Sequence, residues 1–193
     1  MMGVGMSDEA AAAAALPRLG AAEAGAASAR GGAMPAVIAG ARLLLVALWL
    51  GGAVFFSFVV APAAFKVLPQ RELAGAVVTR TIAVANVGGF VAGLVALALG
   101  FVGGGAAARS RRARIVETVA LALVAICCGV GQWVVGARMI ALRAAMGRPI
   151  DAVAAGDPAR AAFNSLHAYS VGLMTVAMLA GVVALLAIAR RRD

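Results

Sequence analysis

The residues that could do chemistry in this chain are a few polar side chains inside long apolar stretches. The segment FNSLHAYS carries Asn164, His167 and Ser170, and helical spacing puts His167 and Ser170 on one face with Asn164 beside them. Asn86 and Gln132 lie in two other apolar stretches. Polar groups at membrane depth are costly and commonly mark function. The five residues therefore form a candidate site for contact with a substrate or a proton.

His167 is the only histidine in the chain, and three interpretations of it remain open. It could form a structural hydrogen bond across helices to Asn86 or Gln132, it could contact a substrate or relay a proton, or it could ligate a metal across a dimer. One histidine cannot make a bis-His haem or a multi-histidine metal site within one chain. With no paired carboxylates or nucleophile–base spacing in the apolar stretches, the sequence predicts no catalytic residue, no metal site, no cofactor and no enzyme.

The composition indicates that these side chains are positioned by membrane helices. Mean hydropathy is +1.00, and 13% of residues are charged, against about 25% in soluble domains. Four intervals lack charge altogether, and each exceeds the ~18 residues that predict a transmembrane helix. They are 43–65, 81–108, 118–137 and 161–189. No alternating pattern typical of membrane strands occurs.

The expected fold is therefore an all-α integral membrane protein, a four-transmembrane-helix bundle that lies in the lipid bilayer. The predicted helices are about 40–63, 82–103, 115–138 and 165–188. They belong to one domain, 36–190. The Ala/Gly-rich segment 1–35 has little to bury, which predicts a disordered tail.

The distribution of positive charge predicts the orientation. Net charge is +9, but the basic residues stand between apolar runs rather than in a stripe on a soluble fold, so nucleic-acid binding is not expected. The runs RSRRAR (109–114) and RRR (190–192) flank helix ends on the side of the termini. The positive-inside rule then places both termini in the cytoplasm of a multi-pass protein of the cytoplasmic (inner) membrane. By this topology, the five candidate site residues lie in the outer half.

The third loop, about 139–164, is the only long one. An amphipathic turn is expected over 138–146, and Asp157–Pro158 predicts an N-cap followed by the first residue of the fourth helix. Glu117 lies near the start of the third helix, beside Arg114. It is expected to form an interfacial salt bridge or to act as a helix-start charge rather than as a proton carrier.

Small residues indicate how the helices pack, because close packing drives helix association in lipid. Gly89 and Gly93 are four residues apart in the second helix. They favour packing within the chain, with a homodimer through the same face as the alternative. The adjacent Cys127 and Cys128 are expected to be small apolar packing residues.

Two segments resemble a known family. They are WLGGAVFFSFVVAPAAFKVLP at 49–69, with W-x-G-G, an aromatic run before Ala-Pro and Phe65 three residues after Pro62, and FNSLHAYSVGL at 163–173, with F-x-x-L-H-x-x-S. Together they are similar to the domain of unknown function 4149, a family that includes transmembrane protein 205. The resemblance implies a four-helix domain over about 38–190 and no established activity. The Trp-Gly-Gly opening is also similar to copper-resistance membrane proteins of the D type, which would use histidine and methionine ligands.

Three functions follow as expectations. The first is a non-enzymatic membrane protein that handles a small solute or ion through the polar cluster near the outer face. The second is a structural or assembly subunit of a membrane complex. The third is copper-resistance-like metal handling, with His167 as the one available histidine.

Overall fold

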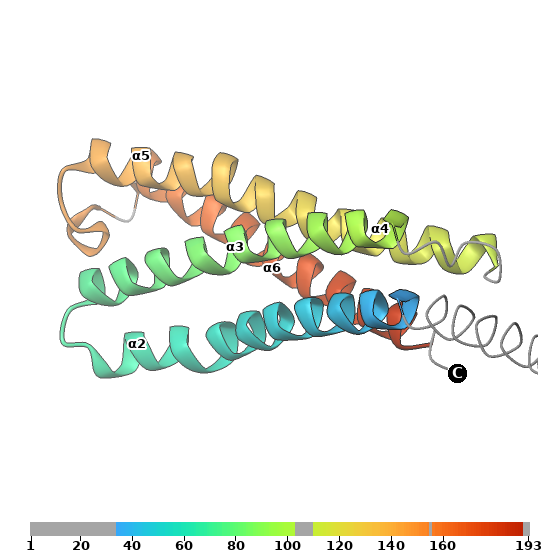
Figure 1. Cartoon of the computed structure of the whole chain (residues 1–193). Helices are drawn as coiled ribbons and strands as arrows, with labels where there is room; N and C mark the ends of the chain where they lie inside the picture. The colour runs from blue at the N-terminus through green and yellow to red at the C-terminus, as the bar shows by residue number, and fades with distance from the viewer. Residues whose placement is uncertain (1–33, 103–109, 155, 191–193) are drawn as a thin grey trace, which may run out of the picture.

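The computed structural model describes residues 34–102, 110–154 and 156–190, and they form four long helical spans (Figure 1). The first span, Met34–Val67, ends in a π-helical segment η1 (Phe56–Val60) and α2 (Ala61–Val67). The second is α3 (Arg71–Val102). The third, Arg111–Met146, joins α4 (Arg111–Val130), the π-helical segment η2 (Gly131–Gly136) and α5 (Ala137–Met146). After the 3₁₀ turn η3 (Ile150–Ala152), α6 (Pro158–Ala189) forms the fourth.

Each span is long and apolar enough to cross a membrane, which confirms the expected all-helical class. The helices are longer than the charge-free intervals suggested: α3 begins at Arg71 rather than near residue 82, and α6 begins at Pro158 rather than near 165. Hydropathy identifies only the apolar part of a helix. The helix itself continues beyond that part through polar and charged residues. Residue 103 and most of the predicted tail, 1–33, lie outside the described residues.

Local signals set several helix ends. The Ser110 hydroxyl accepts a hydrogen bond from the Ala113 amide at the start of α4, and the Asp157 carboxylate accepts one from the Ala159 amide at the start of α6. The predicted N-cap at Asp157 is thereby confirmed. Gly147 ends α5 with φ 61°, a left-handed conformation that favours glycine.

The segment 138–146 differs from the expectation of a separate amphipathic turn. It continues the third span directly through η2, so that α5 extends the same rod (Figure 1). No proline lies between Val130 and Met146, and Gly131 and Gly136 are accommodated within η2. The first strong break is at Gly147 and Pro149.

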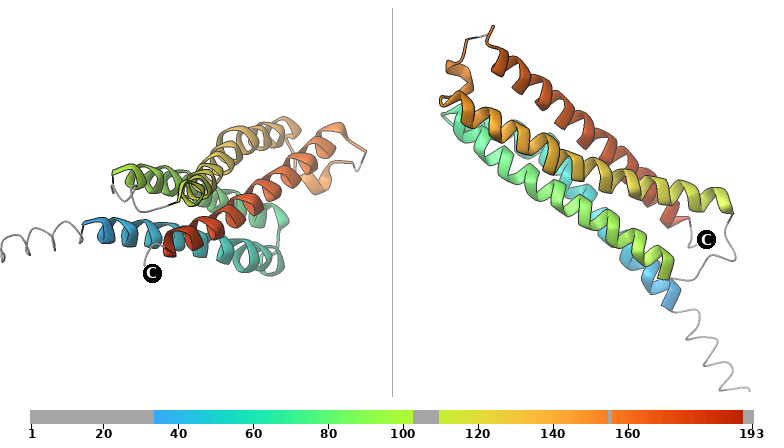
Figure 2. Two further views of the ribbon diagram at one scale, coloured as in Figure 1. Left: turned by 90° about the vertical axis from the view of Figure 1, so that its right-hand side faces the viewer. Right: turned by 90° about the horizontal axis from the view of Figure 1, so that it is seen from above.

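The spans alternate in direction and lie side by side, with α4 packed against both α3 and α6 (Figure 2). The start of the first span, the end of α3, the start of α4 and the end of α6 consequently lie at one end, and the connections that follow α2 and α5 lie at the other (Figures 1 and 2). The two ends of the molecule contain different sets of polar side chains, which are described below.

Two clusters of small and aliphatic side chains fill the interior. The first contains Val46, Ala96, Ala120, Leu121, Ala184 and Ile188. The second contains Val124, Cys127, Cys128, Ala177 and Ala180, with Trp49, Phe90 and Leu173 against it. Both cysteines are buried free thiols, which confirms their predicted packing role. Large apolar side chains such as Leu48, Phe58 and Val84 are exposed on the outside instead.

Trp49 joins three spans in the second cluster. Its indole Nε1 donates a hydrogen bond to the Ala85 carbonyl of α3 at 2.9 Å. A Cβ atom placed on Gly89 would lie 2.5 Å from that same nitrogen, and one on Gly181 of α6 would lie 2.9 Å from the indole Cζ3. The two glycines therefore make the room that the indole occupies.

Gly89 and Gly93 are both buried against other helices of the same chain. A Cβ atom on Gly93 would lie 3.0 Å from the Leu121 carbonyl oxygen of α4. This is the packing within the chain that the small-residue pattern favoured. The alternative, a homodimer through Gly89 and Gly93, stays a prediction.

Candidate solute-binding site

The candidate site is a cavity of about 390 Å³ near the end of the molecule that carries the two short connections. Its walls come from the end of the first span, the first half of α3, the segment η2–α5 and the first half of α6. The volume lies within the ~300–1,000 Å³ of small-molecule pockets. The cavity can therefore hold a small molecule among four spans.

All five side chains of the candidate site line this one cavity. Asn86 comes from α3, Gln132 from η2, and Asn164, His167 and Ser170 from α6. Residues that are far apart in the sequence thus meet in space. Their contact with a substrate or a proton stays a prediction.

Asn86 is the most deeply placed of the five, with 5% of its surface exposed. A Cβ atom on Gly131 would lie 3.3 Å from the Asn86 Nδ2 atom, so the missing side chain at Gly131 leaves room for the amide. Gly131 also begins η2, the π-helical turn that contains Gln132. Single π-turns are rare and frequently occur at functional sites.

His167 and Asn164 are exposed, and Ser170 is half-buried. Within the described part of the chain, the structure shows no hydrogen bond from His167 to Asn86 or Gln132, the partners expected for a structural histidine. The imidazole is instead available to a molecule in the cavity. Among the described residues, no group of three or more His, Cys, Asp or Glu side chains is arranged to hold a metal ion.

The lining also contains arginines that the sequence assigned only to topology. Arg71, Arg143 and Arg160 reach the cavity from α3, α5 and α6. The Arg143 guanidinium lies 5.3 Å from the ring centroid of Phe163, a cation–π contact. Arg160 Nη1 donates to the Val153 carbonyl at 2.6 Å. The predicted helices stopped at the ends of the charge-free intervals. Longer predicted helices would have placed these three arginines on helices at the same end of the molecule.

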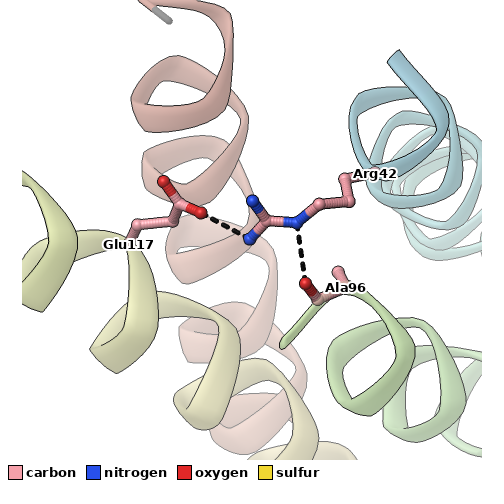
Figure 3. A network of polar contacts seen from close by, with 3 residues as sticks. All are labelled: Arg42, Ala96 and Glu117. Carbon is pink, nitrogen blue, oxygen red and sulfur yellow. Dashed lines mark hydrogen bonds and ion pairs between the residues drawn. The ribbon is translucent and has the colours of Figure 1, made fainter. Parts of the chain in front are cut away.

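A second polar group lies toward the opposite end, nearer the helix ends Met34 and Arg111. Arg42 of the first span forms an ion pair with Glu117 of α4, and its Nε donates to the Ala96 carbonyl of α3 at 2.7 Å (Figure 3). Arg42 is 1% exposed and Glu117 3%. A Cβ atom on Gly100 would lie 2.8 Å from Arg42 Nη2, so this glycine gives the guanidinium its space.

The salt bridge expected of Glu117 is therefore present, but it lies in the interior rather than at the membrane interface. Glu117 is buried between helices and paired with Arg42 of the first span. The sequence contained a signal for this pair. Arg42 and Glu117 each lie within about two helical turns of a helix start, at the same end of the molecule, so they lie at a similar depth. An arginine and a carboxylate at matched depth on packed helices satisfy one another.

Comparison with known proteins places most of this architecture in one family. The family model described as Domain of unknown function (DUF4149) matches residues 44–148, which include Trp49, the two central spans and most of the cavity lining before α6. The match ends before α6, although the sequence resemblance implied a domain over about 38–190. It leaves Asn164, His167 and Ser170 outside. No curated protein and no solved structure matches. Because the family model covers more than half of the chain, the protein belongs to the DUF4149 family.

Proposed function

We propose that this chain is a non-enzymatic, multi-pass protein of the cytoplasmic membrane that binds a small solute in the cavity between α3, α5 and α6. The observation that carries the proposal is the meeting of five polar side chains from three spans in one cavity of about 390 Å³. Convergent polar groups within a largely apolar, preformed pocket are typical of small-molecule sites. The four long apolar helices support the membrane location.

The cavity opens, in this proposal, on the outer side of the membrane. The support comes from Arg111, Arg112 and Arg114 at the start of α4 and Arg190 at the end of α6, which lie at helix ends opposite the cavity. Positive residues next to helix ends favour the cytoplasmic side. Both termini would then be cytoplasmic, and the solute would arrive from outside or from the outer leaflet.

His167→Ala tests the role of the imidazole. Because His167 is exposed and forms no hydrogen bond within the described residues, its removal is expected to change the free energy of unfolding by no more than about 0.5 kcal/mol. Native mass spectrometry of protein released from mild detergent should show an extra bound mass on the wild-type chain and less of it on His167→Ala.

Ser165→Ala is the matched control, since Ser165 is exposed on α6 and its hydroxyl donates to the Ala161 carbonyl of its own helix. It should keep the bound mass. Elemental analysis of the same samples reads out a metal directly. A bare wild-type chain, or a His167→Ala variant that fails to fold, would contradict the proposed role of His167.

A further inference from the structure

The charges in the cavity wall identify a class of solute. Arg71, Arg143 and Arg160 line the cavity together with His167, and the lining contains no Asp or Glu among the described residues. The guanidinium groups of Arg143 and Arg160 therefore give the wall a positive charge. Charges at a partly buried site interact more strongly than charges in water, so this wall attracts anions and repels cations.

Arg143 is placed to bind such an anion. Its Nη2 lies 3.4 Å from the position of a Cβ atom on buried Gly75, and its guanidinium faces the ring of Phe163. The described residues provide it with no hydrogen-bond acceptor. A guanidinium carries several N–H donors in a planar fork that fits carboxylate and phosphate oxygens. Those donors are available to a bound molecule.

Arg160 is held differently and complements Arg143. Its Nη1 is fixed by the Val153 carbonyl, and the structure shows it no other acceptor within the described ranges. The nearest acidic residue on its helix, Asp157, points its carboxylate at the backbone amide of Ala159, 2.8 Å away. The second guanidinium is therefore positioned by the backbone and keeps donors for a ligand.

The remaining wall is apolar. Phe65, Ile82, Ile140 and Val171 contribute aliphatic and aromatic surface beside the polar groups. An inorganic anion would leave this surface in contact with water, whereas a hydrocarbon chain would cover it. The two kinds of lining fit a molecule with an anionic head and an apolar body.

We propose that the solute is an amphiphilic anion, with a phosphate or carboxylate head at Arg143 and Arg160 and a hydrocarbon part against the apolar wall. This inference rests on the proposed function. The same chemistry is carried by an anionic lipid of the outer leaflet and by a water-soluble single-chain amphiphile. The basic side chains of this wall are arginines and not lysines. The planar guanidinium group can bind a phosphate or a carboxylate through two parallel hydrogen bonds.

The test uses the full chain in a neutral maltoside detergent, with hexyl phosphate as the probe. The apparent dissociation constant is obtained from the rise of the thermal unfolding midpoint with probe concentration. Arg143→Gln should weaken binding about tenfold or more, as expected for loss of a charge-assisted hydrogen bond. Arg138→Gln is the matched control, because Arg138 lies on the same helix, is exposed and does not line the cavity. It should bind like the wild type.

Hexyltrimethylammonium, of the same chain length and opposite charge, and hexanol complete the set. Neither should raise the midpoint of the wild type as hexyl phosphate does. If these probes bind as well as hexyl phosphate and Arg143→Gln has no effect, the anionic class is overturned while the solute cavity stands. If Ala83→Leu, which fills the cavity, changes the binding of no probe, the cavity itself is not a binding site and the proposed function fails too.

Equal weakening by Arg143→Gln and Arg138→Gln would also overturn the inference, because general surface charge would then explain binding. Native mass spectrometry separates the two sources of the anion. Phosphatidylglycerol that is retained by the wild type and displaced by hexyl phosphate assigns the site to an anionic lipid. Hexyl phosphate bound to a lipid-free chain assigns it to a soluble amphiphile.

Discussion

Glu117→Ala is expected to lower the free energy of unfolding by about 3–5 kcal/mol, a large share of the stability of a chain this size. Arg42 is 1% exposed and its guanidinium faces Glu117 across the interface of the first span and α4. Removing the carboxylate leaves a buried positive charge without its counter-charge. Among the described residues, the Arg42 Nη1 atom already has no hydrogen-bond partner, so no acceptor there is placed to compensate the stranded charge.

The measurement is the thermal unfolding midpoint in mild detergent, followed by circular dichroism. Glu72→Ala serves as the matched control, since Glu72 is exposed in the first turn of α3 and should cost at most about 1 kcal/mol. The double variant Arg42→Met/Glu117→Leu should recover most of the loss, because apolar replacement of a whole buried pair is often neutral. An unchanged midpoint in Glu117→Ala would show that the pair does not hold the two spans together.

Gly89→Val has the second large expected effect, a loss of about 3 kcal/mol or more. A Cβ atom at this position would lie 2.5 Å from both Cys128 Sγ and Trp49 Nε1, and 2.6 Å from Trp49 Cε2. The indole cannot retreat cheaply, because Nε1 is hydrogen-bonded to the Ala85 carbonyl and its ring lies against Gly181. Overpacking a filled interior costs ~1–3 kcal/mol for modest insertions and more where several helices must separate.

Gly88 provides a control one residue away. It is exposed, and a Cβ atom there would lie 3.7 Å from its nearest neighbour, Trp49 Cδ1, which is an ordinary contact distance. Gly88→Val should therefore unfold close to the wild-type temperature, while Gly89→Val unfolds well below it. Equal midpoints for the two variants would mean that Trp49 is not fixed between α3 and α6.

The sequence predicted the helices and the identity of the polar lining for the same physical reason. Charge is excluded from an apolar layer, so charge-free intervals mark spans and the few polar residues within them stand out. Asn86, Gln132 and His167 were found in this way. Whether these side chains converge depends on which faces of the four helices pack together. Those faces cannot be predicted from a single sequence that consists mostly of Ala, Val, Leu and Gly.

The sequence did not predict that Arg42 forms a buried ion pair or that Arg143 lines the cavity. The sequence patterns interpret the basic residues between the apolar runs, which include Arg42 and Arg143, only as flanking charges that set orientation. In the structure, Arg42 occupies space left by Gly100 of α3, and Arg143 packs against Gly75 of the same helix at an ordinary contact distance. A glycine on one helix opposite an arginine on another is a pairing across the fold, and it becomes visible only when the helices are packed.

The most direct test of a solute cavity open to the outside is cysteine labelling at Asn164. This residue is exposed and lines the cavity, whereas the native Cys127 and Cys128 are buried, so background labelling of them should be low. In intact cells, Asn164→Cys should react with a membrane-impermeant maleimide added outside, and hexyl phosphate should slow the reaction. Labelling that requires permeabilised cells, at a rate that hexyl phosphate does not change, would contradict both the outward orientation and the binding of solute.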